Sequence, residues 1–178
     1  VYLDIEPSGL NKILTEDQCF AKKIMDRYPW ININNARTLF MKSRTIKDPE
    51  EIEEMRKAIS ITNHGIQAIL SNLKENYEYQ IESYFDQAIK YYGATGYAFP
   101  TIAASGKNAC CLHYGENNCI AKDGDLILFD LGASVKMYCA DISRTFPVNG
   151  KFTPRQKELY NIVLQGQQTV FDLSLIHI

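Results

Sequence analysis

The apolar positions after residue 45 first repeat with a helical period. Asp48 is suited to an N-cap, with Pro49 at the first helical position and Glu51 at the third, as in a capping box. A helix is therefore predicted over 48–73, with its apolar face formed by Ile52, Met55, Ile59, Ile66 and Ile69. A second helix is predicted over 79–92, and Gly93 is placed where a left-handed C-terminal cap belongs.

The period changes to that of strands near residue 97. Four strands are predicted, over 97–104, 109–114, 126–131 and 137–146. Thr153, Pro154 and Gln156 then form another capping box, which opens a helix with an apolar side of Leu159, Ile162, Val163 and Val170. The chain from residue 46 onward is thus expected to run helix, helix, four strands, helix.

Residues 1–45 are predicted to be the closing part of an α/β domain, with a strand at 1–5, a helix over 16–28, a strand at 30–33 and a short helix at 39–41. At the other end, the last helix is expected to be interrupted by residues 173–178, LSLIHI. This hexapeptide is what an in-frame transposon sequencing adapter would encode. We therefore expect it to be a scar and exclude it, with His177, from the fold and the site.

Two carboxylates stand among the apolar residues of the last two strands, Asp130 and Asp141. If the connecting turn is Val135-Lys136, the residue numbers of paired positions sum to 271, and the two acids lie directly opposite each other. Ionised carboxylates at that separation repel by about 3–4 kcal/mol. A shared proton, a basic side chain or a metal would relieve this, and a divalent metal pair is the favoured explanation. The alternative is one Asp bonded to backbone amides and one solvated Asp.

Composition narrows the class of protein. The 178 residues are 46% hydrophobic and 22% charged with a net charge of −2, which gives no electrostatic case for nucleic acid or an anionic membrane surface. No apolar run is long enough to span a bilayer. Five cysteines form no CxxC pair, so we expect reduced, buried thiols in a cytoplasmic protein.

Several motifs follow one another at consistent separations. They are FPTIAASG at 99–106, LHYGEN at 112–117, DLG at 130–132 and DISRTF at 141–146, preceded by a linker-like IKDPEEI at 46–52. Together they resemble the pita-bread metallopeptidases, and within them the Xaa-Pro aminopeptidases (aminopeptidase P). The resemblance implies an α/β (α+β) fold with a mixed sheet. Residues 1–45 would be the tail of a creatinase-like N-terminal domain and linker, and 46–172 the first half of a pita-bread catalytic domain.

The resemblance also implies a function, release of an N-terminal residue ahead of proline with two divalent cations, commonly Mn²⁺. Asp130 would be the first acidic ligand, Asp141 the bridging ligand, and His113 the catalytic and substrate-binding histidine. Thr145, on the face of Asp141, is a further candidate for orienting a ligand.

The family completes its site with one His and two Glu that would lie beyond this chain. We therefore expect weak metal binding and no peptidase activity from the chain itself. The resemblance separately implies that the parent enzyme is a homo-oligomer. Prolidase and a non-enzymatic binding protein of the same fold are the alternatives.

Overall fold

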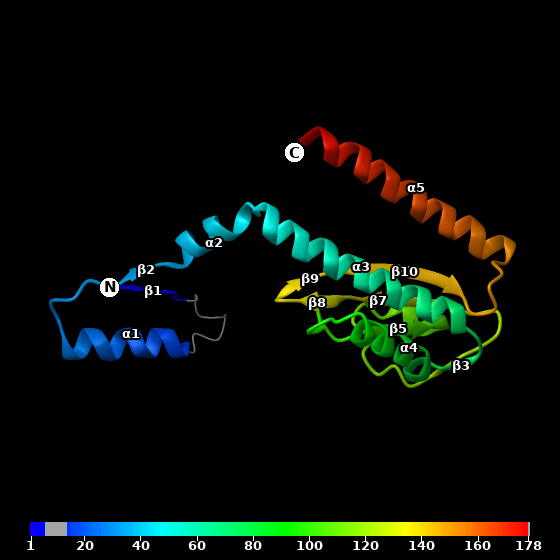
Figure 1. Cartoon of the computed structure of the whole chain (residues 1–178), viewed down its shortest axis with the longest axis horizontal. Coiled ribbons are helices and arrows are strands. Elements are labelled where there is room, and N and C mark those ends of the chain that lie inside the picture. The colour runs from blue at the N-terminus through cyan, green and yellow to red at the C-terminus, as the bar shows by residue number, and fades with distance from the viewer. Residues whose placement is uncertain (6–13, 178) are drawn as a thin grey trace. The chain divides into compact units, whose positions relative to one another are not determined.

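The structure, a computed structural model, describes residues 1–5 and 14–177 and divides into two units, Val1–Pro49 and Glu50–Ile178 (Figure 1). In the first unit, β1 (Tyr2–Leu3) pairs in parallel with β2 (Asn34–Asn35). The helix α1 (Glu16–Arg27) begins with a capping box, and α2 (Arg37–Thr45) follows β2. The strand expected at 30–33 is wrong, because the residues that reach β1 are the next two along the chain.

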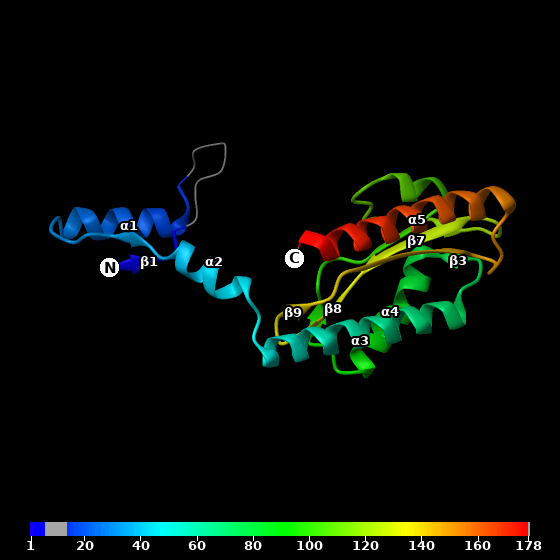
Figure 2. The same ribbon diagram turned by 90° about the horizontal axis from the view of Figure 1, so that it is seen from above.

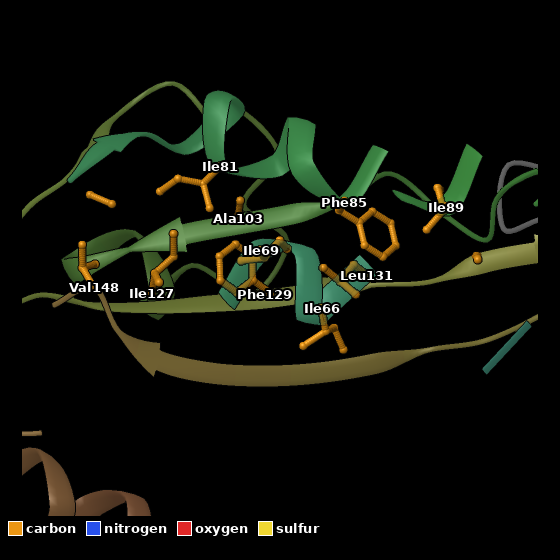
Figure 3. Packing of buried hydrophobic residues seen from close by; sticks show 12 residues of the cluster. Ile66, Ile69, Ile81, Phe85, Ile89, Ala103, Ile127, Phe129, Leu131 and Val148 are labelled. Atoms are coloured by element: carbon orange, nitrogen blue, oxygen red, sulfur yellow. The ribbon is translucent and has the colours of Figure 1, made fainter. Parts of the chain in front are cut away.

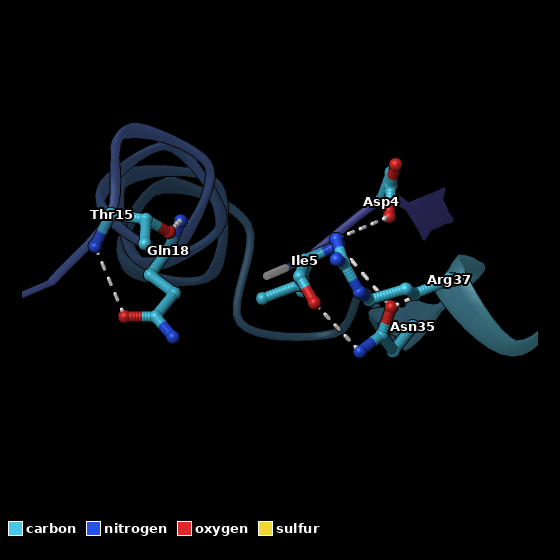
Figure 4. Close-up of polar contacts among 6 residues, drawn as sticks. All are labelled: Asp4, Ile5, Thr15, Gln18, Asn35 and Arg37. Atoms are coloured by element: carbon cyan, nitrogen blue, oxygen red, sulfur yellow. Dashed lines mark hydrogen bonds and ion pairs between the residues drawn. The ribbon is translucent and has the colours of Figure 1, made fainter. Parts of the chain in front are cut away.

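Side-chain contacts hold the ends of these short elements (Figure 4). The hydroxyl of Thr15 accepts from the backbone N–H of Gln18, whose side chain accepts from the N–H of Thr15. Asn35 accepts from the backbone N–H groups of Ile5 and Arg37, and its side-chain amide donates to the carbonyl of Ile5. This unit therefore depends on polar contacts that link β1, β2 and the start of α2.

The second unit begins with two helices, α3 (Pro49–Asn72) and α4 (Glu78–Tyr91), close to the predicted bounds. Gly93 has a φ of +86°, as expected for the cap after α4. The apolar face predicted for α3 is buried only in its second half, where Ile66 and Ile69 enter the core, whereas Ile52 and Ile59 are exposed.

The strands of the second unit form antiparallel pairs. The main sheet has the order β10-β7-β5, from Ile142–Pro147, Leu126–Leu131 and Ile102–Ser105. Two smaller sheets pair β3 (Asn76–Tyr77) with β6 (Ile120–Ala121), and β8 (Ala133–Val135) with both β4 (Gly96–Tyr97) and β9 (Tyr138–Cys139). The strands predicted at 97–104 and 137–146 are each interrupted where the chain passes from one sheet to the other.

The strand predicted at 109–114 is wrong. A 3₁₀ helix, η1 (Gly106–Cys110), and an irregular segment take its place, and Leu112 is 85% exposed. Side-chain hydrogen bonds, described below, hold this segment instead of a strand ladder. A short run of mainly apolar residues thus does not make a strand where no partner strand lies alongside.

The core lies between the two helices and one face of the main sheet (Figure 3). Ile127, Phe129 and Leu131 of β7 point into it, together with Phe85 of α4 and Ile69 of α3. Figure 2 shows α3 and α4 along one side of the strands and α5 (Pro154–His177) along the other. The alternate residues of β7 face away from this core, and Asp130 is one of them.

The last helix begins with the predicted capping box, in which Thr153 and Gln156 bond reciprocally. The helix continues through residue 177, so the interruption expected at 173–178 is not seen up to that residue, and residue 178 lies outside the described residues. Its predicted apolar side is exposed, with Val163 at 72% and Ile162 at 59%. The adapter origin of the hexapeptide stays a prediction.

The expectation of buried cysteines is wrong, since all five are free and exposed. Cys110 is the last residue of η1, Cys111 follows it, and Cys139 lies in the short hairpin strand β9. None of the five cysteines belongs to a buried hydrophobic cluster of the described residues.

Thr62 of α3 supports the strand break that follows β7. Its buried hydroxyl donates to the carbonyl of Ala58 and accepts from the backbone N–H of Ala133 at 2.9 Å. Thr62→Val would leave that N–H without an acceptor, so we expect a loss of about 1–3 kcal/mol in the free energy of unfolding, measured by urea denaturation. Thr169→Val is the matched control, because Thr169 makes the same bond one turn back but is exposed. Equal losses in the two variants would contradict this role.

Candidate metal centre and pocket

Asp130 lies on the open face of the main sheet because side chains alternate along β7. Its neighbours Phe129 and Leu131 are buried in the core, whereas Asp130 and Leu128 are only partly buried on the opposite face. The strand is central in its sheet, so its backbone is fixed by ladders on both sides. A carboxylate placed there is held on a rigid support, as a metal ligand requires.

The register between the two acid-bearing strands differs from the prediction by two residues. The hairpin turn is Lys136-Met137, both with positive φ (+48° and +72°), so the residue numbers of paired positions sum to 273. Ser143, not Asp141, is therefore directly opposite Asp130. The turn at Val135-Lys136 is wrong because two successive positive φ values give the twist that a tight hairpin needs, and the chain adopts them one residue later.

A shift of two residues keeps every side chain on its face, so Asp130 and Asp141 still converge. Asp141 immediately precedes β10 and lies diagonally from Asp130. The pKa of Asp141 is raised above its ordinary value, first by partial loss of hydration and then by the charge and hydrogen bond of Asp130. Asp141 remains exposed, so the neighbouring carboxylate is the more informative cause. The two carboxylates therefore lie close enough to interact.

Ser143 is a contact that the sequence interpretation missed. Its hydroxyl donates to Oδ1 of Asp130 at 2.7 Å, which orients that carboxylate. The sequence did place Ser143 on the same face of the strand as Asp141. Thr145 shares that face too, and it was the residue predicted to orient a ligand. The register alone decides which hydroxyl reaches the acid.

The three predicted site residues, His113, Asp130 and Asp141, line one pocket of about 440 Å³. The rest of its lining is mainly apolar or aromatic, from Phe99, Pro100, Ile102, Tyr114 and Gly115. An imidazole, two carboxylates and an apolar wall around one concave space give a site that can hold a cation and a small apolar group together. Their roles in chemistry stay predictions.

The donor set at this pocket is incomplete. Within the described part of the chain, no group of three or more His, Cys, Asp or Glu side chains could hold a metal ion. Two carboxylates offer hard oxygen ligands that suit Mn²⁺ or Mg²⁺, but fewer than such cations need from a protein for tight binding. The residues present therefore fit part of a divalent metal site.

Glu78 was also missed. It begins α4, is completely buried, and accepts hydrogen bonds from residues on both sides of the segment that carries His113. The signal in the sequence was the spacing of Glu78, Glu82 and Asp86, which places three acids on one side of the helix beside its apolar face.

The comparisons with known proteins agree with this fold. The chain superimposes on a structure described as a putative aminopeptidase P from Bacillus anthracis with a TM-score of 0.88 and 44% identity, over 92% of this chain and 39% of that one. For aminopeptidase P from E. coli with the inhibitor Pro-Leu, the TM-score is 0.82 at 34% identity, over 87% and 38%. The chain thus shares part of the pita-bread fold of these aminopeptidase P structures.

Sequence comparison gives the family. The model of metallopeptidase family M24 matches residues 53–175. The Xaa-Pro aminopeptidase of Escherichia coli K12 is 42% identical over 134 residues, which are 75% of this chain and 30% of that protein. Human Xaa-Pro aminopeptidase 3 is 36% identical over 76% of this chain and 27% of its own length. The chain belongs to metallopeptidase family M24, and it spans 30% and 27% of the lengths of these two relatives.

Among the described residues, no helix has both the length and the hydropathy of a membrane span.

Proposed function

We propose that this chain forms the acidic part of the active site of a metal-dependent aminopeptidase that releases an N-terminal residue ahead of proline. The observation that carries the proposal is the convergence of Asp130 and Asp141 on a pocket that His113 also lines. The sequence similarity to Xaa-Pro aminopeptidases supports the substrate preference. The same names favour an aminopeptidase over the prolidase alternative.

Asp130 and Asp141 would hold the divalent cations, for which Mn²⁺ is the proposed metal because carboxylate oxygens suit hard cations. When bound, a metal pair supplies an activated water and polarises the scissile carbonyl. Ser143 would keep Asp130 oriented through its hydroxyl. Asp141, beside the other carboxylate, would be the shared ligand.

His113 and the apolar wall would position the peptide. The imidazole can donate a hydrogen bond to the substrate carbonyl and so favour the tetrahedral intermediate. Phe99, Pro100 and Ile102 offer the kind of apolar surface against which a proline ring can pack. Water would be partly excluded from this side of the pocket.

The remaining ligands would have to come from outside these residues, since two carboxylates do not complete a dinuclear site. We also propose a cytoplasmic location, which the five free and exposed cysteines support, because exposed thiols persist in reducing compartments. A non-enzymatic binding protein of the same fold would not need metal-ligating side chains, so the paired acids favour an enzyme over that alternative.

Titration of the purified chain with Mn²⁺ tests the metal part of this proposal. We expect weak binding, with a dissociation constant on the order of 10⁻⁴–10⁻³ M, because only two carboxylates contribute. Asp141→Asn should abolish the binding detected by calorimetry. Asp123→Asn is the control, since it makes the same chemical change at a residue in an exposed turn. The chain alone should not cleave a tripeptide with proline second. Undiminished Mn²⁺ binding by Asp141→Asn would refute the assignment.

A further inference from the structure

A buried carboxylate holds the wall of the pocket that carries His113. Glu78 Oε1 accepts hydrogen bonds from the backbone N–H of Ser105 (2.7 Å), the hydroxyl of Ser105 (2.7 Å) and the side-chain amide of Asn108 (3.1 Å). Oε2 accepts from the hydroxyl of Tyr114 (2.7 Å) and the backbone N–H of Cys119 (2.9 Å). One side chain thus receives five hydrogen bonds from residues 105–119.

This carboxylate is ionised in spite of its burial. Burial is the largest influence and raises its pKa, but the hydrogen bonds from Ser105, Tyr114 and Cys119 together outweigh it and lower the pKa below the ordinary value. Tyr114 stays a neutral donor, because burial and the bond to Glu78 raise the pKa of its phenol. Among the described residues, no Lys or Arg forms an ion pair with Glu78. Its charge is therefore balanced by hydrogen-bond donors from one segment.

Regular secondary structure gives that segment little support. Between β5 and β6 only η1 is regular, and residues 111–119 have no strand partner. Yet His113, Tyr114 and Gly115 from this segment line the same pocket as the two acids. Glu78 bonds to Tyr114, the residue after His113, and to Ser105 and Cys119 at the two ends of the segment, but it does not line the pocket itself.

A second set of hydrogen bonds holds the segment at Asn117. Asn117 is buried with a φ of +45°, accepts from the backbone N–H of Ala103 and donates to the carbonyl of Thr101 and to Glu82. It fixes the return of the segment toward the sheet. Glu78 is the tie that reaches the residue next to His113.

We propose that Glu78 is a positioning residue for His113, a buried anionic anchor that sets the distance between the imidazole and the carboxylates of Asp130 and Asp141. The link to catalysis rests on the proposed function, whereas the anchoring of residues 105–119 does not. Glu78→Gln keeps the size of the side chain but replaces one accepting oxygen with an amide group that cannot accept, so at least two of the five bonds are lost.

The test compares Glu78→Gln with Glu51→Gln in the ¹⁵N,¹³C-labelled chain by NMR. Glu51 is the matched control, because it also accepts from a tyrosine hydroxyl, that of Tyr138 at 2.8 Å, but on α3 away from the segment. Without metal, we expect the backbone order parameter of His113 to fall from about 0.85 to below about 0.6 in Glu78→Gln only. Amide exchange at Cys119 should quicken about tenfold or more, while α3 and α4 keep their protection.

Mn²⁺ then reports the distance to the acids. In the unsubstituted chain with excess Mn²⁺, paramagnetic broadening should reach both the His113 ring and the Ile142 amide beside Asp141. In Glu78→Gln the broadening at Ile142 should persist and that at His113 should be lost. A purely structural role would lower the unfolding free energy but leave both signals broadened together.

The outcomes separate the two proposals. An unchanged order parameter at His113 in Glu78→Gln overturns the positioning role, with or without metal. An absence of Mn²⁺ broadening at Ile142 in the unsubstituted chain overturns the proposed function, and the order parameters then decide the role of Glu78. If Glu78→Gln does not fold, Ser105→Ala removes a single donor to the same carboxylate, and a smaller fall in the His113 order parameter is expected. No fall in Ser105→Ala would likewise overturn the positioning role.

Discussion

Asp141→Asn is expected to reduce peptidase activity at least about a thousandfold when the segment is tested inside a complete enzyme. The suitable host is the E. coli Xaa-Pro aminopeptidase, in which residues 53–172 of this chain would replace the corresponding segment. The Asn side chain keeps the shape but removes the charge that would bridge two cations. Losing about 4 kcal/mol of metal-dependent transition-state stabilisation corresponds to about that factor.

The measurement is kcat/KM on a tripeptide and on a dipeptide, each with proline second, in the presence of Mn²⁺. Asp123→Asn in the same chimera should retain full activity, because its exposed turn lies outside the pocket. Cleavage of the tripeptide supports the aminopeptidase, and cleavage of the dipeptide alone supports prolidase. Full activity of the Asp141→Asn chimera would show that the acid pair is not the metal site.

The helices and the faces of the strands could be predicted from the sequence because they depend on local signals. Pro49, Gly93 and Thr153 mark helix ends by capping chemistry, and the structure has ends close to each. Within β7 the one acid, Asp130, lies on the face away from the core, where a carboxylate loses less hydration. These inferences need no knowledge of distant partners.

The register and the loop could not be predicted, because distant residues decide them. The shift from Asp141 to Ser143 as the partner of Asp130 depends on which two residues take positive φ at the hairpin. The segment around His113 is bound by Glu78, 35 residues before His113 on a helix. The spacing of the acids on α4 marks Glu78 as unusual, but it does not reveal which distant segment Glu78 contacts. An error of two residues in register left the site intact, whereas an error of one would have separated the acids.

Gly132 should be the least replaceable glycine of the second unit, because it lies between β7 and β8 where the chain passes closest to Ala140. A Cβ at this position would overlap the backbone carbonyl oxygen of Ala140, and backbone cannot move aside as a flexible side chain can. Ala140 directly precedes Asp141, so relief of the overlap would displace the acid itself. We expect Gly132→Ala to lower the free energy of unfolding by about 3 kcal/mol or more, at the upper end of overpacking effects.

Gly166→Ala is the matched control for this substitution. Gly166 lies in α5 with open space around its Cβ position, so alanine there should stabilise the chain by about 0.5–1 kcal/mol through helix propensity. Urea denaturation measures both changes, and Mn²⁺ titration follows the acid pair. We expect Asp141 to move while Asp130 stays on its strand. Gly132→Ala should therefore lose Mn²⁺ binding even without urea, when the variant is fully folded. Retained stability and Mn²⁺ binding in Gly132→Ala would mean that the β7–β8 break does not set the position of Asp141.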